Sequence, residues 1–268
     1  MKKSDIATSI GLVIGIALMI WGMASGKASI AIFWDPASVG ITVGGSFAAL
    51  LITYPMDQIK ALFKVFVQGF KNSAMAGTDI IEKFTNLSRK ARREGLLSLE
   101  EEINSVENEF MKKGLQMVVD GIEPEVIKDI MELEISEVER RHGDNSSVLK
   151  TWAAFGPAFG MLGTLIGLIQ MLANLSDQSG LASGMATALI TTFYGSLLAN
   201  LILTPMATNL DYKSSLEISN MEMMLEGILA IQSGVNPRIV EEKLTAYLSP
   251  QEKVVYKQTS GDGVTENV

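Results

Sequence analysis

The stretch TWAAFGPAFGMLGTLIGLIQMLANLSDQSGLASGMATALITTFYGSLLANLILTPMATNL, residues 151–210, decides the fold, because Asp177 is its only acidic or basic residue. A second stretch, residues 6–54, carries only Lys27 and Asp35. Soluble proteins spread charge along the chain, since every element presents one face to water. Two nearly uncharged blocks of this length therefore predict a membrane protein.

Polar residues divide each block into two spans. The first block gives spans at 6–23 and about 37–54, and the second gives spans at about 151–175 and 181–207. A span of this kind is roughly 27 Å long as a helix, close to the thickness of the hydrocarbon core. The start also resembles a signal peptide, but the acidic Asp5, the long apolar run and the second span that follows favour a retained span.

The distribution of basic residues predicts the orientation. Of the 22 lysines and arginines, 21 lie before the first span, between spans two and three, or after span four. Cytoplasmic loops carry the excess of Lys and Arg in membrane proteins. We expect a multi-pass membrane protein with both termini in the cytoplasm and both short loops outside.

The remaining sequence is helical in pattern, because no segment alternates with period two for long enough to form a convincing strand. Gly95 and Gly143 are expected to follow helix ends, and Ser98 to open a helix as part of a capping box. Span four is expected to continue as one helix until Gly234. The predicted class is an all-α polytopic membrane protein with four transmembrane helices and a helical cytoplasmic domain. Its parts are spans one and two (1–55), the cytoplasmic domain (56–150), spans three and four (151–207), a cytoplasmic helical extension (208–250) and a disordered tail (251–268).

Residues 56–71 form an amphipathic segment with two open interpretations. Its apolar side chains alternate with Lys60, Lys64 and Lys71 at helical spacing. Such a helix lies at the inner headgroups of the membrane, or packs on its own domain.

Several kinds of chemistry are excluded by composition. The chain has no cysteine and one histidine, His142, so it has no disulfide, thiolate zinc site, cysteine nucleophile or histidine cluster. A net charge of −8 argues against nucleic acid as a partner. No metal site, cofactor or enzymatic activity is predicted.

The spans carry no acid or base at mid-depth, so this chain cannot relay protons across the bilayer by side-chain titration alone. Thr164 and Thr191 lie at matched depth, roughly 15–16 Å below the outer ends of their spans, and Thr192 follows Thr191. Their hydroxyl oxygens suit a hard cation, although membrane threonines commonly bond their own helix carbonyl at i−4. Pro157 and Pro205 are candidate hinges or static kinks near the inner ends of the same spans.

Two further patterns have structural and functional interpretations. Four G-x-x-x-G pairs favour close helix packing, within the chain or in an oligomer: Gly11/Gly15, Gly40/Gly44, Gly156/Gly160 and Gly163/Gly167. A basic helix end containing Arg89, Arg92 and Arg93 meets an acidic helix start at Glu100. This arrangement is either helix-end electrostatics or an exposed patch for a charged protein surface.

With these residues in view, the chain resembles the A-subunit of the bacterial flagellar motor stator, the MotA/PomA family. The resemblance covers most of the chain and rests on the order of spans and three motifs. They are RREGLLSLE at 92–100, GPAFGMLGTLIG at 156–167, and TTFYG at 191–195 followed by ANL at 199–201 and TPMA at 204–207.

The resemblance implies a ring of A-subunits, five by family architecture, around a dimer of a single-span B-subunit that brings one aspartate per chain. Cation flow past that aspartate turns the ring against the rotor protein of the switch complex. Matching positions imply a rotor contact at Arg92 and Glu100. Arg89 and Glu134 are further rotor-binding candidates, and Glu134 matches an acidic position in the cytoplasmic domain. Matching positions also imply coupling at Pro157 and Pro205, and an ion path at Thr164, Thr191 and Thr192.

Alternatives remain for the identity of the transported ion and for the class of function. A threonine at position 164 resembles sodium-type members, whereas proton-type members often have alanine there, and both ions stay open. One alternative is an energiser of outer-membrane processes of the ExbB/TolQ type, whose usual three spans disagree with four. Another is a membrane scaffold that conducts nothing.

Overall fold

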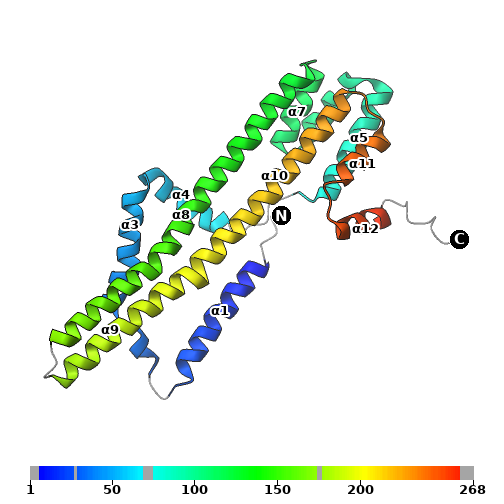
Figure 1. The fold of residues 1–268 in the computed structure, drawn as a ribbon. Coiled ribbons are helices and arrows are strands. Elements are labelled where there is room, and N and C mark those ends of the chain that lie inside the picture. Colours follow the sequence, from blue (N-terminus) through cyan, green and yellow to red (C-terminus); the bar gives the residue numbers. More distant parts are fainter. Residues whose placement is uncertain (1–5, 27–28, 69–74, 174–176, 260–268) are drawn as a thin grey trace. The chain divides into compact units, whose positions relative to one another are not determined.

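The structure is a computed structural model that describes residues 6–26, 29–68, 75–173 and 177–259 (Figure 1). Every regular element within these ranges is helical, which confirms the predicted all-α class. Four helical stretches are long and apolar enough to cross a membrane, and they begin at Ala7, Ile30, Pro124 and Ser179. Each of the four predicted spans overlaps one of these stretches.

The chain divides into two compact units, residues 1–73 with 141–212 and residues 74–140 with 213–268. We call them the membrane unit and the helical unit; the long helices α8 and α10 contribute to both. The first half of the chain contains α1 (Ile6–Ala24), the 3₁₀ turn η1 (Ile30–Phe33), α2 (Pro36–Val39), the π-helical segment η2 (Gly40–Gly44), α3 (Gly45–Thr53), α4 (Met56–Gln68), α5 (Gly77–Glu94), the 3₁₀ turn η3 (Leu96–Leu99), α6 (Glu100–Ser105) and α7 (Glu109–Val119). The second half contains α8 (Pro124–Ala173), α9 (Gln178–Leu197), the π-helical segment η4 (Leu198–Leu203), α10 (Thr204–Gln232), α11 (Pro237–Thr245) and α12 (Pro250–Thr259).

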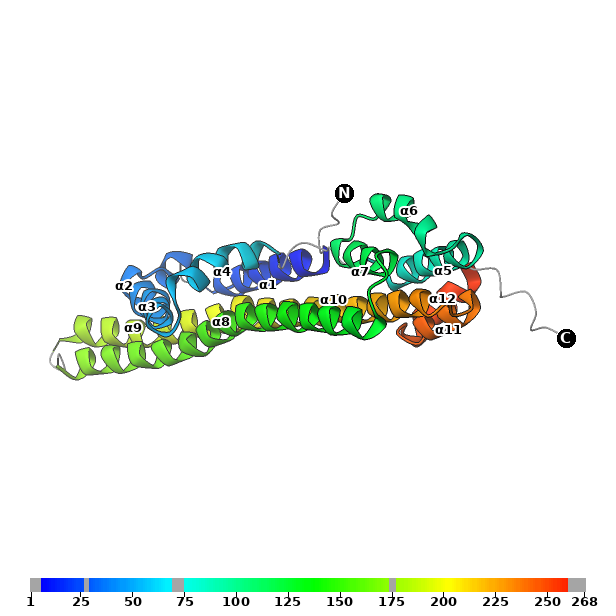
Figure 2. The ribbon, with the colours of Figure 1, turned by 90° about the horizontal axis from the view of Figure 1, so that it is seen from above.

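Glycines bring α8 and α9 into backbone contact along one seam, and both views show the two helices side by side (Figures 1 and 2). A Cβ added at Gly195 would lie 2.5 Å from the carbonyl oxygen of Gly156, and one at Gly167 would lie 2.5 Å from that of Gly184. Gly160 similarly faces the backbone of Thr191 and Thr192. The G-x-x-x-G pairs of span three therefore pack within this chain, whereas Gly11, Gly40 and Gly44 meet nothing within 4 Å.

The other membrane helices pack around α9 and η4. In α1, Gly15 faces the side chain of Leu201, and α2 and η2 pack on α9. The Trp152 indole N–H of α8 donates to the Ser46 hydroxyl of α3 at 3.1 Å. Ile59 and Leu62 of α4 are buried in the same apolar cluster as Leu50 and Leu203, so the inner face of α4 packs on its own unit. These two residues therefore pack on residues of the membrane unit, and both interpretations of the amphipathic segment stay predictions.

The helical unit has its own apolar core, built from α5, α7, α11 and the parts of α8 and α10 that belong to it. Phe84 is fully buried against Gly227, where a Cβ would lie 2.6 Å from its ring. Gly95 and Gly234 follow the ends of α5 and α10 with φ of +88° and +65°, as predicted, because glycine adopts this conformation without a Cβ clash.

Three local expectations were wrong. Gly143 lies inside α8, which continues through it; a single glycine lowers helix stability by only about 1 kcal/mol, so neighbouring helical residues override it. Ser98 opens no capping box: its hydroxyl donates to the Gly95 carbonyl at 2.6 Å, within the turn before α6. The predicted tail instead begins with α12, where the Tyr256 hydroxyl donates to Glu241 at 2.9 Å, while residues 260–268 lie outside the described ranges.

Candidate functional site

The hydroxyls of Thr164 and Thr192 meet between α8 and α9. Their Oγ1 atoms are 2.8 Å apart, and the pair lies beside the glycine seam, where Gly160 lets the helices approach. Thr164 Oγ1 also lies within hydrogen-bonding distance of the Gly160 carbonyl, at 3.0 Å, and Thr192 Oγ1 of the Ala188 carbonyl, at 3.2 Å. Each hydroxyl has one proton, so the two protons serve two of these three contacts at a time. Both are the i−4 bonds common for membrane threonines, but here they hold two hydroxyls face to face.

The pair retains acceptor capacity after these bonds are made. Each hydroxyl has one proton and two lone pairs. If Thr164 donates to Gly160 and Thr192 donates to Thr164, then Thr192 keeps two lone pairs and Thr164 keeps one. Thr192 is exposed in the single chain and Thr164 half-buried, so these oxygens are accessible to an ion or to water.

Thr191 is separated from this pair. Its side chain is fully buried, and its hydroxyl donates to the carbonyls of Thr187 and Ala188 at 2.8 and 3.1 Å. A Cβ at Gly163 would lie only 2.4 Å from it, so Thr191 fills the space that this glycine leaves in the seam. The structure thus brings together two of the three predicted threonines and gives the third a packing position.

The two prolines occupy different local structures. Pro157 lies inside the continuous helix α8, whereas Pro205 is the second residue of α10, directly after the π-helical segment η4. Both rings are exposed. The wider turn of η4 accommodates Pro205, whose ring would clash with the carbonyl four residues earlier in a regular α-helix.

Sequence reasoning missed Tyr194 as a structural tie. Its hydroxyl donates to the Phe33 carbonyl and accepts from the Asp35 N–H at 3.3 Å, which joins α9 to the connection between α1 and α2. The Phe33 and Phe193 rings pack beside it, with centroids 5.9 Å apart. A tyrosine among small apolar residues was the available signal, but its partner could not be read from the sequence.

The charged candidates of the helical unit lie at the end of α5 and the start of α6. Arg89, Arg92 and Glu100 are exposed, and the intervening Leu97 is 73% exposed. Among the described residues, neither Arg92 nor Glu100 takes part in an ion pair. Arg89 donates to the Asn86 side chain at 3.2 Å.

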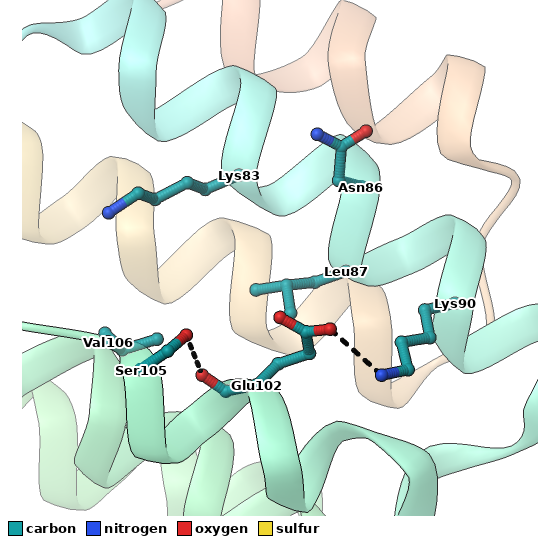
Figure 3. A pocket seen from close by; sticks show the side chains of 7 residues that line it. All are labelled: Lys83, Asn86, Leu87, Lys90, Glu102, Ser105 and Val106. Carbon is teal, nitrogen blue, oxygen red and sulfur yellow. Dashed lines mark hydrogen bonds and ion pairs between the residues drawn. The ribbon is translucent and has the colours of Figure 1, made fainter.

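An ion pair joins the two helices that carry these charges. Lys90 of α5 lies 2.9 Å from the Glu102 carboxylate of α6, and this hydrogen bond raises the pKa of Lys90 (Figure 3). The pair closes one end of a pocket of about 250 Å³ lined by Lys83, Asn86, Leu87, Lys90, Glu102, Ser105 and Val106. The pair links the two elements that present Arg92 and Glu100.

Glu134 is held apart from this group. It lies on α8, half-buried, and its carboxylate accepts from Lys113 of α7 at 2.5 Å. Within the described part of the chain, no hydrogen bond or ion pair connects Glu134 to Arg89, Arg92 or Glu100. The same residues contain no group of three or more histidine, aspartate and glutamate side chains that could hold a metal ion.

Comparison with known proteins places these features in one family. Residues 9–95 match the family described as Motility protein A N-terminal, and residues 102–223 match the MotA/TolQ/ExbB proton channel family. Motility protein A of Treponema pallidum is 46% identical over 247 residues, which cover 92% of this chain and 95% of that protein. Chemotaxis protein PomA of Vibrio alginolyticus is 37% identical, with 91% of this chain and 96% of that protein covered.

A solved structure, that of the flagellar MotAB stator complex from Bacillus subtilis, contains a chain with the same fold. It superposes with a TM-score of 0.88 at 31% identity and covers 94% of this chain and 99% of that one. The match extends over both the membrane helices and the helical unit. The chain therefore belongs to the MotA/PomA family of flagellar stator subunits.

Proposed function

We propose that this chain is the A-subunit of an ion-driven flagellar stator and that the Thr164–Thr192 hydroxyl pair forms its part of the cation path. The observation that carries the proposal is the 2.8 Å contact of two hydroxyls that keep free lone pairs inside apolar membrane helices. No acidic or basic residue accompanies them at that depth, so the carboxylate comes from an aspartate of the single-span B-subunit. The similar solved structure from Bacillus subtilis, that of a flagellar MotAB stator complex, supports a partnership of this kind.

The proposed assembly is a ring of five copies around two B-subunits. Large apolar side chains of α8 and α9 are exposed in the single chain, including Met161, Leu165, Ile169 and Leu189 at 56–70%. Neighbouring copies and the B-subunit spans would cover them. Mass measurement of the purified complex in detergent tests this assembly. A stable monomer that ignores the B-subunit would contradict it.

The proposed orientation puts both termini and the helical unit in the cytoplasm. It is supported by the 21 of 22 basic residues that lie on one side of the spans. Because the chain has no cysteine, single cysteines introduced at Ser98 and Ser179 can be labelled from one side at a time. Ser98→Cys should react only from the cytoplasm and Ser179→Cys only from outside.

The proposed ion is sodium, with protons as the alternative. A sodium ion that sheds part of its water beside a carboxylate uses hydroxyl oxygens, whereas a proton needs only the carboxylate and water. Thr164→Ala removes one oxygen of the pair and should lower rotation speed and change its dependence on external sodium. Thr53→Ala is the control, since its exposed hydroxyl makes the same kind of i−4 bond, at 2.9 Å, elsewhere in the membrane unit. Wild-type speed that stays flat across sodium concentrations at fixed membrane potential and pH would exclude sodium and leave protons.

The proposed rotor contact is the exposed segment around Arg92 and Glu100, with Arg89 beside it and Glu134 as a further acidic position. Arg92→Glu and Glu100→Lys should impair motility without lowering protein level, because exposed charges contribute little to stability. A compensating charge change on the rotor protein should restore movement. If cells with either variant swim normally, the segment does not contact the rotor, and its charges only stabilise the two helix ends.

The proposed coupling uses Pro157 and Pro205. Pro157 interrupts the hydrogen bonding of α8, which carries Thr164, and Pro205 interrupts that of the continuous stretch of α9, η4 and α10, which carries Thr192. Pro157→Ala and Pro205→Ala should reduce torque per ion without abolishing cation flux. Parallel measurement of flux and rotation separates these effects. Equal loss of both quantities would argue against a coupling role.

A further inference from the structure

Polar side chains continue from Thr192 in a single row along α9, η4 and α10. They recur every fourth residue, and all are exposed in the chain: Thr192, Ser196, Asn200, Thr204 and Thr208. We call them the polar row. It runs from residue 192 to residue 208, a rise of roughly 24 Å, within the membrane unit. It begins at the hydroxyl pair and ends near the ion pair of Lys150 with Asp211.

The row offers mainly oxygen acceptors. The Thr208 hydroxyl donates to the Thr204 carbonyl at 3.0 Å, and the Asn200 amide donates to the carbonyl and hydroxyl of Ser196 at 3.1 and 3.2 Å. These donors are therefore used within the helix, while the oxygens keep lone pairs. An exposed amide facing lipid tails is unfavourable, so the row lies against protein or water in the assembled membrane protein.

The π-helical segment adds a main-chain oxygen at the centre of the row. The Thr204 N–H donates to the Ala199 carbonyl, five residues earlier. In this register the next bond would run from residue 205 to the Asn200 carbonyl, but Pro205 has no N–H. The Asn200 carbonyl therefore receives no bond from residue 205. Backbone carbonyls freed at irregular turns are recurrent cation ligands in membrane proteins.

A hollow of about 270 Å³ opens at the same place. It is lined by Met19, Phe193, Ser196, Leu197, Asn200 and Leu201, so the middle of the row faces open space between α1 and α9 with η4. Water occupies about 30 Å³ per molecule in the liquid, and a site with several oxygens can hold it. The volume is large enough for several waters, and Ser196 and Asn200 are the polar residues of a lining that is otherwise apolar.

We infer that the polar row is one wall of a hydrated route that carries the cation from the Thr164–Thr192 pair to the Lys150–Asp211 end of the membrane unit. The inference rests on the proposed function, and in the proposed orientation this end is the cytoplasmic one. Asn200 is the central binding position, since its side-chain amide contacts the Ser196 hydroxyl at 3.2 Å and its main-chain carbonyl receives no bond from Pro205. The cation keeps part of its water along the route.

The absence of cysteine makes the test direct. Ser196→Cys, Asn200→Cys and Thr204→Cys are each assembled with the B-subunit, reconstituted in liposomes and treated with a small, charged, water-soluble thiol reagent. Val13→Cys is the control: Val13 is 65% exposed in the chain and lies near Gly15, which contacts Leu201 at the depth of the row. Row cysteines should react at least tenfold faster than Val13→Cys, and modification should reduce cation flux at least fivefold.

Asn200→Leu provides a second readout, because it keeps the approximate size and removes the polar group. Flux should fall at least tenfold while the mass of the complex in detergent stays unchanged. Loss of assembly would overturn the inference and make the row a helix–helix interface. Row cysteines that react no faster than Val13→Cys, or that react without any change in flux, would overturn it as well. Unmodified wild-type complexes that carry no cation current would instead refute the proposed function, and the labelling rates would still report whether the row is hydrated.

Discussion

Replacing Gly195 by alanine should separate α8 from α9 and thereby open the hydroxyl pair. The added Cβ would lie 2.5 Å from the Gly156 carbonyl oxygen, 3.1 Å from its carbonyl carbon and 3.2 Å from the Gly160 Cα. All three are backbone atoms, which cannot turn aside as a flexible side chain does. Ordinary contact begins at 3.4 Å, so the helices must move apart by about 1 Å at this level.

The movement is large compared with the hydrogen bond beside it. Thr192 lies one helical turn from Gly195, and its Oγ1 is 2.8 Å from that of Thr164. A separation of about 1 Å lengthens this contact beyond hydrogen-bonding distance. Overpacking of this kind typically destabilises by about 1–3 kcal/mol. For a chain of this size, that lowers the melting temperature by about 2–4 °C per kcal/mol.

Two measurements on the purified complex with the B-subunit test this prediction. Thermal unfolding in detergent should show a lower melting temperature for Gly195→Ala, and liposome flux should be reduced at equal protein level. Gly143→Ala is the matched control, because it makes the same chemical change inside α8 where nothing lies within 4 Å. It should raise stability by about 1 kcal/mol through helix propensity. An unchanged melting temperature and flux for Gly195→Ala would refute the close seam, and destabilisation by Gly143→Ala would refute the continuity of α8.

Two further predictions concern single contacts. Tyr194→Phe removes the hydroxyl that bonds Phe33 and Asp35, and it should lower stability by about 1–3 kcal/mol without changing the mass of the complex; a melting temperature equal to that of the wild type would show that this tie is dispensable. The Ser249 hydroxyl, at 2.6 Å, and the Ser249 N–H, at 2.9 Å, donate to the Glu252 carboxylate and lower its pKa below the usual 4.5. These bonds therefore stabilise α12 fully above pH 4.5, and the stabilisation is lost as the pH falls through the lowered pKa of Glu252 in the folded protein. The protection of the Lys253–Tyr256 amides, measured as exchange relative to an unstructured peptide at the same pH, should therefore fall on acidification in the wild type but not in Glu252→Gln; identical pH dependence of protection in both would contradict the assignment.

Depth in the membrane could be read from the sequence, whereas direction around the helix axis could not. Counting residues from the span ends placed Thr164 and Thr191 at one level, because a helix rises about 1.5 Å per residue. Successive side chains point about 100° apart, so only one of two adjacent threonines can face Thr164. The structure gives that position to Thr192 and buries Thr191 against Gly163. The choice depends on where α8 lies, which periodicity does not specify.

Strong local signals predicted the helix ends, and weak ones did not. The helix ends predicted at Gly95 and Gly234 were correct, because each glycine follows a helical run and precedes the start of another helix. Gly143 looked similar in sequence, but apolar contacts on both sides keep α8 helical through it. The π-helical segments and the partners of Tyr194 left no sequence pattern, since both depend on contacts between distant parts of the chain.

The contact between Asp35 and Tyr194 also sets an order for biosynthesis. The two residues are 159 positions apart, and at about 5–20 residues per second a ribosome needs about 8–32 s to reach the second after the first. The helix pair α8–α9, whose partners are close in sequence, can close as soon as it emerges. The first two spans must instead wait in the bilayer, without the surface they pack on, until α9 has been inserted. During that interval they are the part of the nascent protein most open to membrane proteases and to pairing with a wrong neighbour.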